Sequence, residues 1–404
     1  MLGADSPFRD RAFLRYWLAR VFSISGYLVQ SVAIAWQIYA LTDSAVDLGL
    51  VGLVQFLPRV LLLPVVGNAA DRYDRRQLML ASQVVQGIAI LVLTLACASD
   101  NVSRELLFFI VLVTGAARTL EMPATQSLLP ALVTPATLPR AVALSAAATQ
   151  TATIVAPALG GLLFAFGATS VYAVATAMFC VAVMSTVRLA SPPQTRIAVT
   201  VSGTEHFMAG IRFIARERAI LGAISLDLFA VLLGGATALL PIIARDILDT
   251  GPWGLGLLRS APAVGALAVS FWLAHHPLEN SVGKWMFGCV ALFGVATIAF
   301  GLSRSMTVSM ISLLVLGGAD MVSVVIRNAY IQLQTPDAMR GRVSAVNSMF
   351  VGASNQLGEF ESGLTAAWLG TVPAVVLGGI GTLLVVVVWM RVFPELWHAQ
   401  RLER

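Results

Sequence analysis

Several charged residues lie inside long apolar runs of the sequence, where an ionised side chain is costly in a lipid bilayer. We select as candidates for proton coupling or substrate binding Arg20, Arg118, Glu121, Asp227, Asp320, Arg327 and Glu359. A carboxylate in such a place can take up and release a proton, and an arginine can hold a carboxylate or an anionic ligand. These residues predict ion and solute binding within a membrane.

The spacing of two pairs indicates which candidates act together. Arg118 and Glu121 are three residues apart, and Asp320 and Arg327 are seven apart, so on a helix each pair shares one face. A pair of this kind is either a proton switch, in which the protonated acid releases the arginine, or a static pair that stabilises the bundle. The sequence leaves both interpretations open for both pairs.

Asp227 differs because no other charged residue lies within a helical turn of it. This isolation in an apolar run favours a role in proton coupling. Glu359 and Glu361 are two residues apart and point to different faces of a helix, so at most one of them faces a transport pathway.

The composition identifies the elements that must position these residues. The chain has 404 residues, is 58% hydrophobic and only 12% charged, and has a mean hydropathy of +0.83. Soluble domains carry about a quarter charged residues, so this chain is predicted to be a polytopic membrane protein. The net charge of +5 reflects basic cytoplasmic loops, and no nucleic acid partner is predicted. Three scattered cysteines indicate neither a disulfide framework nor a metal site.

Continuous apolar runs long enough to cross a bilayer as helices predict an all-α fold with twelve transmembrane spans, because a β-barrel would show short alternating segments. The expected spans are 13–39, 45–68, 77–98, 105–128, 141–166, 168–188, 219–247, 253–274, 283–303, 306–330, 343–368 and 372–393. Arg9 and Arg11 precede the first span and Arg15 lies at its start, and no convincing cleavage site follows it, so we expect this span to be retained.

Basic residues gather in alternate loops and predict that both termini are cytoplasmic. The segments expected inside contain Arg9, Arg11, Arg15, Arg72, Arg75, Arg76, Arg140, Arg188, Arg196, Arg212, Arg216, Arg218, Lys284, Arg340, Arg342, Arg401 and Arg404. The segments expected outside contain little beyond Arg104, Arg245 and Arg304. The predicted location is the bacterial inner membrane.

A polar stretch at 189–218 divides the chain into an N-terminal six-helix bundle, 1–188, and a C-terminal six-helix bundle, 219–404. Within this stretch Phe207, Ile211 and Ile214 recur at helical spacing beside arginines, which favours an amphipathic helix on the cytoplasmic membrane face over a plain connector. We therefore treat 189–218 as a cytoplasmic linker with an amphipathic helix.

Short matches between the halves indicate a duplication. Gly52 and Pro58 correspond to Gly256 and Pro262, Thr134-Pro135 corresponds to Thr335-Pro336, and Gly161-Leu162 corresponds to Gly363-Leu364. All three are separated by nearly the same number of residues, half the length of the chain. Parallel repeats of this kind are typical of transporters with a substrate site between their halves.

The loop after the second span reads Gly67-Asn68-Ala69-Ala70-Asp71-Arg72-Tyr73-Asp74-Arg75-Arg76. It resembles the G-x-x-x-D-R-x-x-R-R signature of the major facilitator superfamily, with Asp74 where glycine is common. The resemblance implies a fold of two six-helix bundles and a cytoplasmic latch that holds the outward-facing state. Its residues here would be Gly67, Asp71, Arg72, Arg75 and Arg76.

Three further segments are similar to the bacterial branch of enterobactin-exporter-like and drug-efflux permeases. They are Pro157-Ala158-Leu159-Gly160-Gly161, Leu226-Asp227-Leu228-Phe229 and the run from Gln334 to Val343. Many antiporters have glycine at the first position of a G-P-x-x-G-G element, which Ala156 occupies here. This departure argues slightly against antiport.

No P-loop, H-E-x-x-H or G-x-S-x-G motif is present, so we predict neither an enzyme nor ATP drive. The expected function is export of a small siderophore-like or drug-like molecule, without cofactors, by a monomer that uses the proton gradient. Alternatives are a proton-coupled importer of a siderophore or metabolite, a lipid transporter, and a non-transporting membrane sensor.

Overall fold

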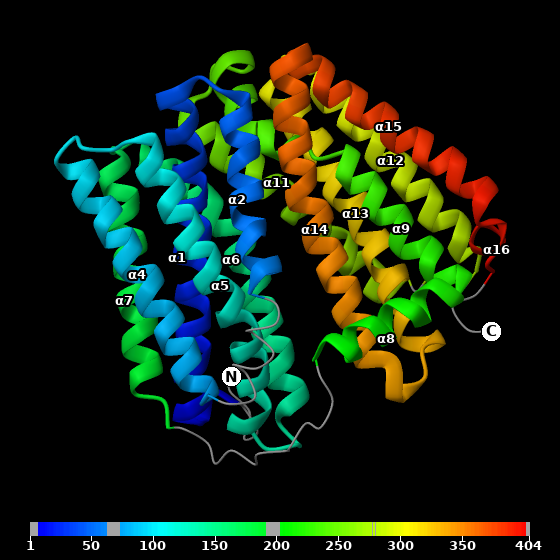
Figure 1. Ribbon diagram of the computed structural model, residues 1–404, viewed down its shortest axis with the longest axis horizontal. Helices are drawn as coiled ribbons and strands as arrows, with labels where there is room; N and C mark the ends of the chain where they lie inside the picture. Colours follow the sequence, from blue (N-terminus) through cyan, green and yellow to red (C-terminus); the bar gives the residue numbers. More distant parts are fainter. Residues whose placement is uncertain (1–6, 63–72, 191–202, 277, 279, 401–404) are drawn as a thin grey trace. The chain divides into compact units, whose positions relative to one another are not determined.

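The structure is a computed structural model and describes residues 7–62, 73–190, 203–276, 278 and 280–400 (Figure 1). Throughout this described part the regular elements are helices, which confirms the predicted all-α polytopic fold. In the first half they are η1 (Pro7–Arg9), α1 (Arg11–Thr42), α2 (Ala45–Leu61), α4 (Arg75–Ala98), α5 (Arg104–Leu132), α6 (Leu138–Phe164) and α7 (Ala168–Val187). In the second half they are α8 (Gly203–Arg216), α9 (Arg218–Leu233), η2 (Ala236–Leu239), α10 (Leu240–Ile242), η3 (Ile243–Ile247), α11 (Gly251–His275), α12 (Val282–Leu302), α13 (Met306–Gln334), α14 (Asp337–Leu369), α15 (Thr371–Val392) and α16 (Pro394–Trp397).

Ten helical segments of the described chain are long and apolar enough to cross a membrane. The two other expected spans, 45–68 and 343–368, correspond to α2 and α14. The described part of α2 has 17 residues, and part of its expected span lies outside the described residues. α14 has 33 residues but carries Asn347, Gln356 and Glu359 along its length, which lowers its hydropathy.

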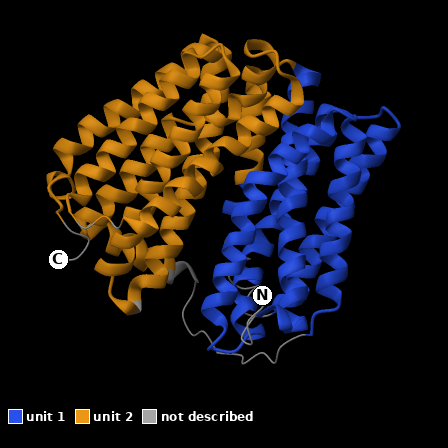
Figure 2. Ribbon diagram, turned by 180° about the vertical axis from the view of Figure 1, so that it is seen from behind, with its two compact units in different colours: residues 1–42, 57–200 blue, residues 43–56, 201–404 orange. Residues whose placement is uncertain are grey.

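The chain divides into two compact units (Figure 2). Unit 1 comprises residues 1–42 and 57–200, and unit 2 comprises residues 43–56 and 201–404. The change from one unit to the other therefore falls within α2. The boundaries expected from the sequence, at 188 and 219, stay a prediction.

Unit 1 is organised around α1, which packs against α5, α6 and α7. A side chain at Gly160 of α6 would meet the Val29 carbonyl of α1 at 2.8 Å, so glycine is needed for this approach. Near one end, Phe13, Tyr16 and Met79 form a fully buried apolar cluster. These contacts pack α1 and its neighbouring helices into one body.

Unit 2 contains an even closer helix pair, α11 and α13. A Cβ at Gly265 would overlap the Leu314 carbonyl, and a Cβ at Gly317 would overlap the Pro262 carbonyl. These reciprocal backbone contacts hold α13, which carries two of the candidate charges, against α11.

α8 runs across one end of unit 2 (Figure 1). Its Ile214 is buried in an apolar cluster with Ile220 of α9, Ile331 of α13 and Val346 of α14. The expected amphipathic helix is present, but this apolar face packs on protein, whereas the sequence interpretation placed it against lipid. Periodicity identifies an apolar face without identifying what covers it.

The repeated segments occupy corresponding elements of the two halves. Pro58 and Pro262 lie inside α2 and α11, and Gly161 and Gly363 lie inside α6 and α14. The backbone adds a further match, at two glycines with the same unusual torsion angles. Gly167, before α7, has φ 97° and ψ 156°, and Gly370, before α15, has φ 90° and ψ 159°. Only glycine adopts this region without strain.

We expect Gly167→Ala to reduce stability by about 1–3 kcal/mol, because a Cβ strains this backbone conformation. No atom lies within 4 Å of that Cβ, so steric overlap does not contribute. The measurement is the temperature at which the detergent-solubilised protein stops eluting as a single species after heating. Gly288→Ala in α12 is the control, since Gly288 is equally uncrowded but has no positive φ. Equal behaviour of the two variants would contradict the backbone argument.

Candidate functional site

In unit 1 the candidate Glu121 of α5 is 3% exposed and accepts hydrogen bonds on both carboxylate oxygens. Its Oε1 accepts from Ser23 Oγ of α1 at 2.5 Å and from Gln83 Nε2 of α4 at 3.2 Å. Its Oε2 accepts from Gln86 Nε2 of α4 at 2.8 Å and from Arg118 Nη1 at 3.2 Å. Three helices thus supply four donors to one buried carboxylate, and this network satisfies its hydrogen-bonding capacity.

Arg118, the ionic partner of Glu121, is the more accessible of the two, with 18% of its side chain exposed. Its guanidinium also lies 4.8 Å from the centre of the Tyr27 ring of α1, within cation–π range. The Arg118–Glu121 ion pair predicted from spacing therefore forms, and further contacts hold both side chains. Its action as a proton switch stays a prediction.

Arg20 of α1 lies one turn from Ser23, on the same side of the helix as the Glu121 network. It donates from Nη1 to Tyr16 Oη at 3.1 Å and from Nη2 to Thr149 Oγ1 of α6 at 3.2 Å. Unit 1 thus brings Arg20, Arg118 and Glu121 to one polar region of the bundle.

In unit 2, Asp227 of α9 forms an ion pair with Arg327 of α13. Their side chains are 6% and 3% exposed. As expected, no cationic residue lies within a turn of Asp227 on α9 itself. Its cationic partner, Arg327, comes from a different helix. Asp320 shares a face of α13 with Arg327, yet in the described part of the chain it makes no hydrogen bond and no ion pair within 4.0 Å.

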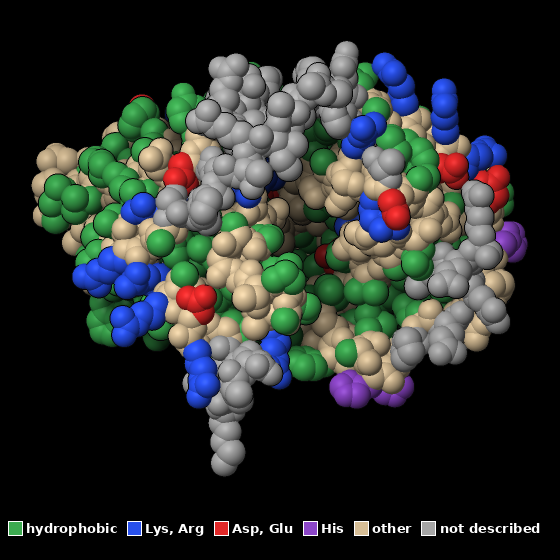
Figure 3. Space-filling view, turned by 90° about the horizontal axis from the view of Figure 1, so that it is seen from below, with side chains coloured by type: hydrophobic (Ala, Val, Ile, Leu, Met, Phe, Trp, Pro, Cys, Tyr) green, Lys and Arg blue, Asp and Glu red, His purple; other side chains and the backbone are tan. Residues whose placement is uncertain are grey.

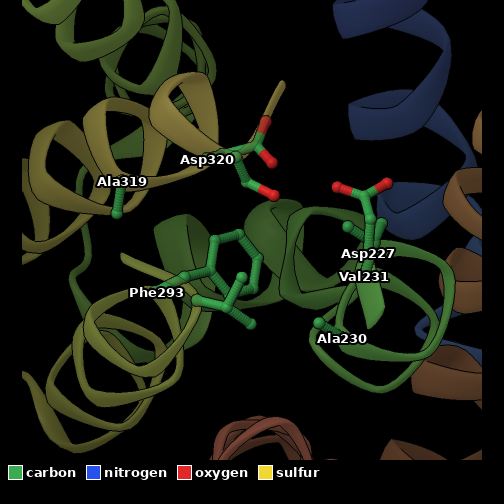
Figure 4. A pocket seen from close by; sticks show the side chains of 8 residues that line it. Asp227, Ala230, Val231, Phe293, Ala319 and Asp320 are labelled. Atoms are coloured by element: carbon green, nitrogen blue, oxygen red, sulfur yellow. The ribbon is translucent and has the colours of Figure 1, made fainter. Parts of the chain in front are cut away.

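Asp227 and Asp320 line one small cavity between α9, α12 and α13. Figure 4 shows their carboxylates on opposite walls of this pocket, one on α9 and one on α13. Ser323 of α13 completes the polar part of the lining, and Val290 and Phe293 of α12 belong to its apolar part. Two carboxylates and a hydroxyl therefore surround a small space with apolar walls.

Glu359 of α14 lies elsewhere in unit 2 and does not line this cavity. Its side chain is packed against Gly52 of α2, where a Cβ would lie 2.7 Å from Glu359 Oε2. Arg259 of α11 interacts with it electrostatically. The structure thus separates Glu359 from the other unit 2 candidates.

The motif expected to form a latch is described in part. Gly67, Asp71 and Arg72 lie outside the described residues. Asp74 caps α4 by accepting from the Arg76 backbone N–H at 2.8 Å, which gives the departure from the family pattern a structural role. The side chains of Arg75 and Arg76 bind backbone carbonyls of α5 and α7.

These arginine contacts are within unit 1. Arg75 donates to the Ser127 carbonyl at 2.9 Å, and Arg76 donates to the carbonyls of Thr186 at 3.0 Å and Val187 at 2.6 Å. Cations at the carboxyl end of a helix complement its dipole. Both residues thus tie α4 to its neighbours, and their expected gating role stays a prediction.

Sequence reasoning missed the partners that complete both sites. Gln83 and Gln86 are polar residues one turn apart in an apolar run, a signal that could have marked the face of α4 toward Glu121. Ser323 lies one turn after Asp320 and has the same kind of signal. No three His, Cys, Asp or Glu side chains of the described residues group so as to hold a metal ion.

Comparison with known proteins gives a family match over nearly the whole chain. The family model described as "Transmembrane secretion effector" matches residues 2–403. The enterobactin exporter EntS of Escherichia coli strain K12 is 26% identical over 397 residues, which cover 96% of this chain and 93% of the relative. The strain O127:H6 protein is 26% identical over 395 residues, which cover 95% and 92%.

Solved transporter structures share the fold at low sequence identity. A bacterial homologue of the human lysosomal transporter Spinster has a TM-score of 0.73 and 14% identity, with 97% of this chain and 96% of that chain covered. A bacterial homologue of the iron transporter ferroportin has a TM-score of 0.71 and 19% identity, with 98% and 100% covered. The nucleoside transporter NupG has a TM-score of 0.69 and 15% identity, with 95% and 99% covered.

These matches confirm the major facilitator fold and the expectation of a transporter rather than an enzyme. They also establish a multi-pass membrane protein with a small-molecule substrate. The chain belongs to the transmembrane secretion effector family and is a major facilitator permease of the enterobactin-exporter-like branch.

Proposed function

We propose that this secondary transporter exports a small siderophore-like or drug-like organic molecule across the bacterial inner membrane in exchange for protons. The observation that carries the proposal is the group formed by Asp227, Asp320 and Arg327 inside two membrane-spanning segments of unit 2. Export as the direction is supported by the relatives, which are named as enterobactin exporters.

The charges of this group favour exchange of a single proton. Two carboxylates and one guanidinium carry a net charge of −1 when all three are ionised, and one bound proton neutralises the group. Because net charge is costly within the apolar part of a membrane, a proton is held there until a change of conformation or a competing ligand releases it. No cofactor is needed for such a cycle.

Glu121 serves a different purpose in this proposal. Its carboxylate already accepts from four side-chain donors, whereas Asp320 has no such partner in the described chain. We therefore assign Glu121 to holding Arg118 beside Tyr27. The coupled proton is carried by the Asp227–Asp320 pair.

Asp320→Asn is expected to lower proton-driven transport on the order of tenfold or more, because it removes the net charge that one proton would neutralise. The assay uses inverted membrane vesicles with an imposed inside-acid pH gradient in sodium-free choline buffer. A panel of siderophores and of cationic and neutral dyes is added, and their uptake and the collapse of the gradient are followed. Glu395→Gln is the control, since Glu395 forms an exposed ion pair with Arg218.

Full activity of Asp320→Asn would exclude this carboxylate as the proton carrier. Solute movement out of the inverted vesicles together with protons would favour an importer. Movement of labelled phospholipid would favour a lipid transporter, and no transport of any compound would favour a sensor.

Glu121→Gln is expected to destabilise unit 1 by about 1–3 kcal/mol, because the amide presents an N–H₂ group to donors that the carboxylate oxygens now satisfy. Thermal unfolding in detergent measures this loss. Glu105→Gln, an exposed change in the first turn of the same helix, removes only a favourable helix-terminal charge and should cost less, about 0.3–1 kcal/mol. A stable Glu121→Gln protein without proton coupling would instead make Glu121 the proton carrier.

Both termini are proposed to lie in the cytoplasm. Figure 3 shows Lys and Arg side chains exposed on the face viewed from below, and α8, whose Arg212 and Arg216 are exposed, lies at that end of unit 2. Such basic segments remain on the cytoplasmic side.

A green fluorescent protein fused to the C-terminus should therefore fluoresce, and alkaline phosphatase fused there should be inactive. Alkaline phosphatase fused after Asp100, in the turn between α4 and α5, should be active. The reverse pattern of phosphatase activity would show the opposite orientation.

A further inference from the structure

We infer that the cavity between α9, α12 and α13 binds a bare monovalent cation, with Na⁺ as the physiological candidate, through Asp227, Asp320 and Ser323. The inference rests on the proposed function for its meaning in transport, because it names a second ion that can occupy the coupling group. Binding of the cation to this site can be measured without a transport assay.

The size of the cavity separates this site from a substrate site. Pockets for organic ligands occupy hundreds of cubic ångströms, whereas this cavity has room for about one water-sized particle. An organic solute does not fit, but a single dehydrated ion does. Val290, Phe293 and Ala319 form the apolar part of the lining, and the cavity is partly open on the side of the half-buried Asp320.

The polar lining consists of oxygen atoms, which are the ligands that hard cations prefer. Asp227 Oδ1 is engaged by Arg327. The remaining Asp227 oxygen, both Asp320 oxygens and Ser323 Oγ are then available to an ion. Ser323 is 2% exposed, and in the described part of the chain its Oγ has no hydrogen-bond partner. A buried hydroxyl without a partner is unfavourable unless a ligand satisfies it.

The net charge of Asp227, Asp320 and Arg327 indicates which ionic charge the site can neutralise. With Arg327 paired to Asp227, the three ionised side chains leave one negative charge, which one monovalent cation neutralises. A divalent cation would leave an uncompensated positive charge in an apolar environment, which is costly. Size, ligand type and charge therefore all point to a monovalent cation.

A proton and this cation compete for the same carboxylates. Among the lining residues only Asp227 and Asp320 are carboxylic acids, and Arg327 is the charged residue paired with Asp227. α12 presents Val290 and Phe293, and α14 and α15, which also pack on α9, contribute no lining residue. Lowering the pH therefore weakens cation binding, by up to about tenfold in half-saturating concentration for each pH unit.

The test measures thermal unfolding of the purified full-length protein in detergent during titration with NaCl, KCl, choline chloride or CaCl₂ at constant ionic strength. We expect a saturable stabilisation by Na⁺ that choline does not reproduce, at concentrations that rise as the pH falls. Binding of ²²Na⁺ to the same samples provides the direct readout. A larger response to Ca²⁺ than to Na⁺ would overturn the charge argument, and an equal response to all three monovalent salts would overturn the site.

Three variants connect the response to the cavity. Asp320→Asn should abolish the Na⁺ response, and Ser323→Ala should raise the half-saturating concentration several-fold without preventing folding. Ser260→Ala in α11 is the matched control, because Ser260 is also buried but donates to the Gly256 carbonyl of its own helix at 3.0 Å. An unchanged response in both cavity variants would overturn the proposal.

This assay needs neither a substrate nor a pH gradient, whereas the vesicle assay contains no Na⁺. A protein that binds Na⁺ but exchanges no protons would overturn only the proposed function. A protein that exchanges protons but does not respond to Na⁺ would overturn only this inference.

Discussion

A charge placed inside an apolar helix is costly unless a partner within its own bundle stabilises it, and this constraint shapes both units. Glu121 is surrounded by donors from three helices, and Asp227 of α9 is paired with Arg327 of α13. Because burial of an unpaired charge in lipid is so costly, these contacts also determine which helix faces can turn inward. The glycine contacts that bring α13 against α11 and α6 against α1 make the required close packing possible.

The two polar groups satisfy this constraint to different degrees, and that difference suggests a division of labour. The unit 1 carboxylate has as many donors as it can use, so changing its ionisation would disrupt a network spread over three helices. In unit 2 the one arginine of the group pairs with Asp227, and Asp320 is left facing a cavity. A site that lacks one positive charge can be completed reversibly, which a coupling site requires.

Much of the fold was predictable because long apolar runs and basic loops are local signals. The span at α14 was also expected, although its polar residues make its hydropathy low. The pairing of the charges was less accessible, since Arg327 is distant in sequence from Asp227 and only packing brings them together. Spacing found the Arg118–Glu121 pair because both residues lie on one helix, but gave no information on Gln83 or Gln86. The apolar face of α8 was likewise predictable. Only the tertiary structure shows that residues of α9, α13 and α14 cover this face.

The glycine corners before α7 and α15 show that the record of a duplication can outlast the similarity of side chains. Gly167 and Gly370 share nearly identical torsion angles, although the helices around them have diverged. Any other residue strains that conformation, so each corner resists substitution even where its surroundings would accommodate one. The two halves can therefore be aligned on backbone conformation, and residues at equal distances from the two corners become natural counterparts when functions are compared between halves.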